Sequence, residues 1–293
     1  VAYDVPIIGY GNDTVNTLRL WEARSPEGFD LKLFNDQTYL QASAKAVEAE
    51  DISRVLYPND TKKDGKQLRL KQQYFFTSAS LQDIVRRYKS IYGNDFSRFA
   101  DKIAIQLNDT HPVVAIPELM RIFLDVEKLG WDESWNICKK VFAYTNHTIL
   151  SEALEKWDIA LFQSLLPRIY QIVEEINRRF VLELQQKYPG DWKRINKMSI
   201  VGNGQIRMAW LAIVGSHKVN GVAELHTEIL KNSELKEWNE LYPEKFLNKT
   251  NGITQRRWLL KSNPELAALI TELIGDKWIT DLYELKKWWQ YFK

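Results

Sequence analysis

Short apolar runs, each followed first by a polar cluster and then by a helical pattern, constrain the fold of this chain most strongly. The runs cover residues 103–107, 141–144, 198–201 and 246–247. Their length is typical of strands, and their alternation with helices is typical of parallel sheets. We therefore predict a helix-rich α/β fold with a doubly wound layer structure.

The helical patterns lie between these runs. We predict helices over residues 80–92, 115–128, 151–188, 207–231 (in part), 264–274 and 280–291. Ser80 and Asp83 match a capping box, which predicts that the first of these helices begins there. Pro167 predicts a break in the long segment, because proline cannot continue a helix from its interior.

The polar clusters carry the functional information, because ligands of open parallel sheets bind outside the carboxyl ends of the strands. The clusters occupy 108–111, 145–148, 202–204 and 248–252. Together, their asparagine, aspartate, histidine and threonine side chains offer both donors and acceptors of hydrogen bonds. That chemistry suits a polyhydroxylated ligand.

Each cluster also has a plainer interpretation. Asp109 and His111 could contact a ligand, or Asp109 could cap the next helix. His147 at a second strand end could be structural or could share a crevice with them. For His217 and His226, which lie in a helical stretch, we favour structural roles. The Gly202–Gly204 segment favours a simple turn over a phosphate cradle, since the full dinucleotide fingerprint is missing.

Two loops leave alternatives open. Residues 57–65 form a polar loop that is either a solvated turn or a mobile gate at a pocket mouth. The Arg256–Arg257 doublet could bind an anion or form salt bridges.

Charge and cysteine content exclude several classes of protein. The formal net charge of +2 gives no basic stripe for nucleic acid or membrane. Cys138 is the single cysteine, so a disulfide framework is impossible and a thiolate zinc site is not expected. No apolar run reaches the length of a transmembrane helix. From the residues alone we predict a soluble α/β protein with a polar crevice, and no particular reaction.

A set of ordered motifs gives the chain a family resemblance. They are NTLRLW at 16–21, ISRVLYPND at 52–60, LRLKQ at 68–72, AIQLNDTHP at 104–112, AYTNHT at 143–148, GSH at 215–217 with VNGVA at 219–223, and KTNGIT at 249–254. Together they resemble the glycogen and starch (α-glucan) phosphorylases over essentially the whole chain. The shorter segment at 92–95 resembles the bacterial type.

The resemblance implies an enzyme that cleaves α-1,4-glucan with phosphate and releases glucose 1-phosphate with retention of configuration. It implies two Rossmann-like domains of the glycosyltransferase type. Residues 1–248 would be the later part of the N-terminal, glucan-binding domain, and 249–293 the start of a truncated, cofactor-binding C-terminal domain. It also implies a pyridoxal phosphate cofactor, a cytoplasmic location and a homodimer, with no nucleic acid or membrane partner.

By the same resemblance the chain is the middle fragment of a longer enzyme. The cofactor lysine and the phosphate-binding cluster would lie outside it, so we expect no catalytic residue here and no activity from the fragment alone. The alternative is a non-catalytic glucan-binding module.

The resemblance also assigns roles to residues. Asn251 and His147 look like the pair that hydrogen-bonds the 6-hydroxyl of the glucosyl unit. His111 and Asp109 look like the cluster that lines the catalytic cleft, and Val222 like an apolar contact to the sugar ring.

Two further residues match the family at the edges of the site. Asp60 looks like the tip of the gating loop, and Trp258 like part of the wall around the cofactor. Thr61 and the Lys62–Lys63 pair depart from the animal enzymes, so we do not expect the purine-type inhibitor site that aromatic residues build in those enzymes.

Overall fold

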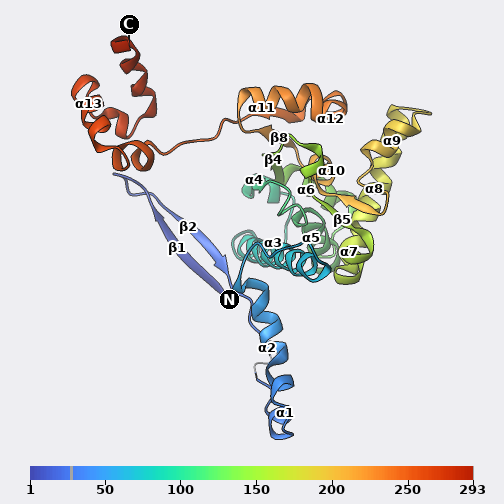
Figure 1. The fold of residues 1–293 in the computed structure, drawn as a ribbon. Coiled ribbons are helices and arrows are strands. Elements are labelled where there is room, and N and C mark those ends of the chain that lie inside the picture. Colours follow the sequence, from blue (N-terminus) through green and yellow to red (C-terminus); the bar gives the residue numbers. More distant parts are fainter. Residues whose placement is uncertain (27–28, 293) are drawn as a thin grey trace. The chain divides into compact units, whose positions relative to one another are not determined.

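The computed structural model describes residues 1–26 and 29–292 and divides the chain into two compact units (Figure 1). The larger unit consists of Val1–Tyr3 and Arg19–Lys249, and the smaller one of Asp4–Leu18 and the residues from Thr250 onward. Strands β1 (Ala2–Ile8) and β2 (Val15–Trp21) pair in a two-stranded sheet of their own.

A four-stranded parallel sheet lies at the centre of the larger unit. Its order is β3 (Ile105–Asn108), β4 (Phe142–Thr145), β8 (Lys218–Gly221) and β9 (Phe246–Asn248). Every neighbouring pair in this sheet runs parallel. The sheet, together with the many helices, confirms the helix-rich α/β prediction.

One of the predicted strand assignments is wrong in this region. The 198–201 run contributes only to β6 (Val201–Gly202), which belongs to a separate antiparallel sheet with order β5-β7-β6. Asn203 and Gly204, both with positive φ, form the tight turn between β6 and β7 (Gln205–Arg207). This favours the simple-turn interpretation over a phosphate cradle. Strand β8 lies inside residues 207–231, which we predicted to be helical in part.

Helix α3 (Lys63–Tyr92) runs through the position where a capping box was predicted. Ser80 lies in the interior of this helix, and its hydroxyl donates to the carbonyl of Phe76 at 2.8 Å. Asp83 pairs instead with Arg19 and Arg86. The capping-box prediction is therefore wrong, because both side chains have partners elsewhere.

The other α-helices of the larger unit complete its fold. They are α1 (Leu31–Asn35), α2 (Tyr39–Arg54), α4 (Phe99–Lys102), α5 (Ala115–Arg121), α6 (Trp131–Val141), α7 (Ile159–Leu165), α8 (Pro167–Lys187), α9 (Trp192–Met198), α10 (Met208–Gly215), α11 (Glu224–Ile229) and α12 (Lys236–Leu241), with strand β5 at Lys156–Asp158. A π-helical segment, Ile122–Val126, extends α5. Pro167 is the first residue of α8, so the predicted break is confirmed.

The smaller unit has its own core. Helix α13 (Pro264–Ile274) ends at Gly275, which has φ of 83°, and the Leu282–Phe292 segment forms a 3₁₀ helix. Ala267, Ile270 and Trp278 are buried together. The Trp278 indole donates to Thr271 Oγ1 at 3.1 Å, which satisfies its buried N–H.

A buried carboxylate links α3 to α5. Glu118 is fully buried and accepts from Tyr74 and Ser78 of α3 at 3.0 and 2.7 Å. Arg121 donates to both of its oxygens at 2.7 and 2.8 Å. Both oxygens are thus satisfied, which is the condition under which a buried charge is tolerated.

We expect Glu118→Ala to lower the free energy of unfolding by about 3–5 kcal/mol, because it leaves the charge of Arg121 and the α3 hydroxyls without their acceptor. Denaturant unfolding measures the change. Glu175→Ala is the control, since Glu175 also accepts from two arginines, Arg178 and Arg179, but at the surface. An exposed pair contributes at most about 1 kcal/mol. Equal losses in the two variants would contradict the assignment.

Lys245 is a half-buried lysine, placed just before β9. Its ammonium donates to the carbonyls of Ile213 and Val214 near the end of α10, at 2.9 and 3.4 Å. It also lies 4.1 Å from the centre of the Tyr242 ring. Burial disfavours the charged form and lowers the pKa of Lys245 to about 8.

Because the folded-state pKa of Lys245 lies below its unfolded value, the unfolded chain binds more protons between these two values. The free energy of unfolding should therefore rise from pH 8 to about pH 10.5, by up to roughly 1.4 kcal/mol per pH unit. Lys245→Met should remove this contribution. Unfolding curves of both proteins across this pH range check the prediction, and identical pH dependence in the two would refute it.

Candidate functional site

The carboxyl edge of the parallel sheet holds its following loops in register. The backbone N–H of Asp109 donates to the carbonyl of Thr145, and that of Asn146 to Asn220, at 3.0 and 2.9 Å. On the other side of β8, the N–H of Lys249 donates to the carbonyl of Gly221 at 3.1 Å. The ladder thus continues past the strands, and the residues after them are fixed side by side.

A row of polar side chains crosses the same edge. Gln106 donates to Thr145 Oγ1 at 2.8 Å, and Thr145 donates to Asn220 Oδ1 at 2.9 Å. The amide of Asn220 donates to the carbonyl of Gly221 at 3.0 Å. This row links β3, β4 and β8 through side chains as well as backbone.

His147 lies at the end of β4 and reaches across to β3. Its Nε2 lies 2.6 Å from Asn108 Oδ1, and its ring is exposed. The buried Asn146 fixes the turn, since its Oδ1 accepts from the N–H of Thr148 and its amide donates to the hydroxyl of Tyr144. His147 is therefore an exposed imidazole on a constrained backbone.

Val222, at the end of β8, is held by a residue whose site role we did not predict. His226 Nδ1 accepts from the N–H of Val222 at 3.0 Å, so the ring proton resides on Nε2. Burial and the neighbouring His147 lower the pKa of His226, which favours the neutral ring. Gly221 must lack a side chain, because a Cβ there would lie 2.4 Å from Thr227 Oγ1.

Asp109 and His111 follow β3 in a strained turn. Asp109 has φ of 66°, and its Oδ1 accepts from the N–H of Thr110 at 2.7 Å. Helix α5 begins later, with Val114 as its N-cap and no side-chain cap bond, so the capping interpretation of Asp109 is wrong. His111 lines a cavity of about 210 Å³ with Tyr57, whose ring meets it edge-on at 6.3 Å.

The predicted gate loop folds back onto the first turn of α3. Asp60 accepts from Arg69 at 2.7 Å. A Cβ on Gly65 would lie 1.9 Å from the carbonyl oxygen of Asn59, so only glycine permits this close approach. Tyr57, with φ of 56°, is 81% exposed.

Asn251 and Trp258 belong to the smaller unit, so their pairing with the sheet residues stays a prediction. Asn251 is exposed in an irregular segment, and Trp258 is 68% exposed. Arg256 donates to the carbonyl of Ile279 at 2.9 Å and lies over the Tyr10 ring. This contact of Arg256 is to a backbone carbonyl rather than the salt bridge that we considered, and anion binding by the doublet stays a prediction.

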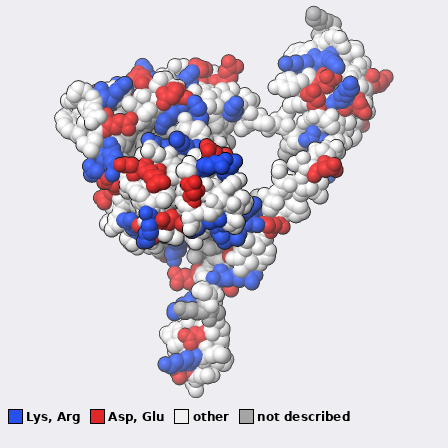
Figure 2. Space-filling model, turned by 180° about the vertical axis from the view of Figure 1, so that it is seen from behind, with Lys and Arg blue, Asp and Glu red and all other residues white. Residues whose placement is uncertain are grey.

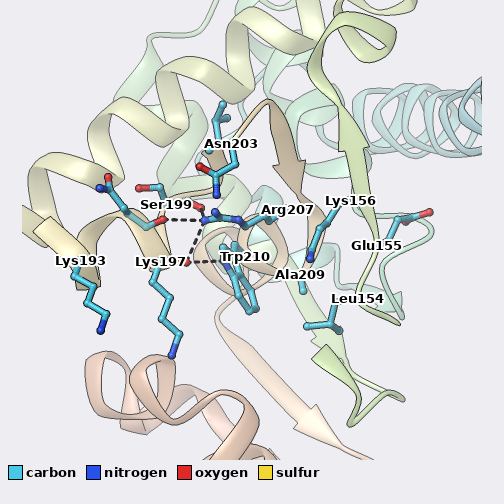
Figure 3. A pocket seen from close by; sticks show the side chains of 13 residues that line it. Leu154, Glu155, Lys156, Lys193, Lys197, Ser199, Asn203, Arg207, Ala209 and Trp210 are labelled. Atoms are coloured by element: carbon cyan, nitrogen blue, oxygen red, sulfur yellow. Dashed lines mark hydrogen bonds between the residues drawn. The ribbon is translucent and has the colours of Figure 1, made fainter. Parts of the chain in front are cut away.

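A larger cavity, of about 620 Å³, is lined in part by Gly202 and Asn203 of the β6–β7 hairpin (Figure 3). Its basic lining suggests an anion, but Arg207 donates to the carbonyls of Asn196, Lys197 and Ser199 and so closes the end of α9. The Lys197 ammonium pairs with Glu237. Two of the cationic side chains that line the cavity, Arg207 and Lys197, thus already have partners within the protein.

Metal and membrane features are absent from the part of the chain that the structure describes. Residues 1–26 and 29–292 contain no group of three or more histidine, cysteine or acidic residues that could hold a metal ion. Nor does any helix within them combine the length and apolar character that crossing a membrane requires. Figure 2 shows basic and acidic side chains interspersed on the face that it presents.

Comparison with known proteins gives a consistent result over the full sequence. The family model for carbohydrate phosphorylase matches residues 1–293. Relatives named glycogen phosphorylase, brain form, from Rattus norvegicus and Homo sapiens, and muscle form, from Oryctolagus cuniculus, are each 54% identical to it over 297 residues. The alignments cover 98% of this chain and 35% of each relative, so the chain spans about a third of their length. The chain belongs to the carbohydrate phosphorylase family.

Proposed function

We propose that this chain supplies sugar-contacting residues to an enzyme that cleaves α-1,4-glucan with phosphate and releases glucose 1-phosphate, with retention of configuration. The observation that supports this most directly is the hydrogen-bonded row at the carboxyl edge of the sheet, in a member of the phosphorylase family. The activity belongs to the full gene product that contains this chain. The partners proposed are the glucan, phosphate and glucose 1-phosphate, with a homodimeric assembly.

The proposed sugar contacts use groups that can both donate and accept. His147 and Asn251 would bind the 6-hydroxyl of the glucosyl unit, and Val222 would pack against the ring. A site that hydrogen-bonds a hydroxyl rejects an analogue without it, because its own polar groups are then left unpaired. The bond from His147 to Asn108 orients the imidazole before any ligand arrives.

Asp109 and His111 would line the cleft around the reacting bond, and Asp60 would lie at the tip of the loop over it. A glycosyl transfer passes through an oxocarbenium-like centre, which must be held and oriented while water is excluded. His111 contacts Tyr57 of the loop. That loop also carries Asp60, and it would limit the access of water.

The proposed cofactor is pyridoxal phosphate, which when bound would supply acid–base chemistry through its phosphate. In this chain Trp258 would form part of its wall. The exposed indole offers an apolar surface and a single donor, which does not by itself make a phosphate-binding site. The roles above therefore rest on this chain's own side chains and their contacts.

We expect His147→Ala in the full gene product to lower kcat/KM for phosphorolysis by roughly tenfold to a hundredfold, through loss of a hydrogen bond to the sugar. The assay measures glucose 1-phosphate released from an α-1,4-glucan. In the reverse direction, 6-deoxyglucose 1-phosphate should be a poor substrate for the wild type. In the His147→Ala variant, removing the 6-hydroxyl from the substrate should lower kcat/KM by a much smaller factor than in the wild type.

His217→Ala is the matched control. His217 is an exposed histidine directly before β8, at the amino edge of the same sheet. It should leave both rates unchanged. An unaltered 6-hydroxyl preference in His147→Ala would exclude the assigned contact, and absence of phosphorolysis in the wild-type gene product would favour a glucan-binding module instead.

A further inference from the structure

Arg69 connects two segments that are far apart in the sequence. It lies in the second turn of α3, and its Nη1 donates to Asp60 Oδ2 at 2.7 Å. Its Nη2 donates to Glu155 Oε1 at 2.9 Å. One guanidinium thus bridges the loop that precedes α3 and the segment that precedes β5.

The two carboxylates differ in exposure. The side chain of Glu155 is 10% exposed, whereas that of Asp60 is 41% exposed. Glu155 Oε1 also accepts from the Gln73 amide at 2.9 Å, whereas Glu155 Oε2 and Gln73 Oε1 are buried without a partner among the described residues. Among the described contacts, Arg69 therefore supplies the positive charge that compensates this buried carboxylate, and lysine cannot reproduce its two-pronged geometry.

Each end of this bridge leads to residues proposed to contact the sugar. Glu155 ends the 146–155 segment, which begins with Asn146 and His147 after β4. The carbonyl of Glu155 also accepts from the N–H of Met208 at 3.1 Å, which fixes the backbone at that end. Asp60 lies in loop 57–62, whose Tyr57 meets His111.

We propose that Arg69 is a positioning residue that couples loop 57–62 to the 146–155 segment through Asp60 and Glu155. The effect of this coupling on catalysis rests on the proposed function. The structural coupling itself does not depend on that function. Without Glu155, the Arg69 guanidinium keeps one acceptor, Asp60, and its side chain can adopt more conformations. It then holds Asp60 less firmly, so loop 57–62 becomes more mobile. By linkage, loss of Asp60 loosens the 146–155 segment in the same way.

Hydrogen–deuterium exchange of the full gene product tests the coupling. Glu155→Gln should speed amide exchange in loop 57–62 by about threefold to tenfold, although Glu155 does not contact that loop. Glu127→Gln is the matched control: Glu127 is also 10% exposed and accepts from Lys89 of the same helix at 2.6 Å. This control should leave loop 57–62 unchanged.

Asp60→Asn provides the reciprocal measurement without removing a buried charge. It should speed exchange in the 146–155 segment, and Arg69→Lys should speed exchange in both segments. The proposal would be overturned if loop 57–62 exchanged at the wild-type rate in the Glu155→Gln variant, or if the 146–155 segment did so in the Asp60→Asn variant. An equal effect of Glu127→Gln would also overturn it, since that would indicate general loosening of α3.

Phosphorolysis measured on the same proteins separates the two proposals. If the coupling holds, Glu155→Gln should raise KM for the glucan more than it lowers kcat, since Glu155 touches no proposed reacting group. Coupled exchange in a gene product that makes no glucose 1-phosphate would refute the proposed function alone. Normal wild-type phosphorolysis with uncoupled exchange would refute the role of Arg69 alone.

Discussion

The candidate site depends on backbone hydrogen bonds that continue beyond the ends of the parallel strands. The N–H groups of Asp109, Asn146 and Lys249 still pair with the neighbouring strand or its end. Because parallel strands end at one edge, this pairing places the following residues side by side. The polar row from Gln106 to Asn220 links β3, β4 and β8 through side chains at the same edge. The histidines and the aspartate at this edge are therefore positioned by the sheet.

Much of this edge could be predicted from sequence, because apolar runs and polar clusters are local signals. The runs at 103–107, 141–144 and 246–247 became β3, β4 and β9. Strand β8 escaped prediction because it has one strongly apolar residue, Val219, between helical stretches. We assigned the 198–201 run to the wrong sheet. The Asn–Gly turn that follows it is a signal for an antiparallel hairpin, and the run does pair antiparallel with β7 after that turn.

The site shows the same division between local and long-range information. The position of His147 at this edge could be predicted because it lies two residues after the end of a strand. His226 was assigned a structural role because it lies on a helix, and only the fold shows that its ring holds Val222. The link from Arg69 to Glu155 spans 86 residues and has no sequence signature. Such contacts depend on how α3 packs against the segment before β5, which periodicity does not determine.

Glu118 and Glu155 both contact α3 and are little exposed, yet they differ in how their oxygens are paired. Glu118 has hydrogen-bond partners on both oxygens, so its charge is compensated at little cost. Glu155 has both of its bonds on one oxygen, and the other oxygen is buried without a partner among the described residues. A buried acceptor left unpaired costs about 1–3 kcal/mol. Well-packed apolar residues would avoid that cost, so Glu155 is better explained by what its charge holds in place, namely the guanidinium that also binds Asp60.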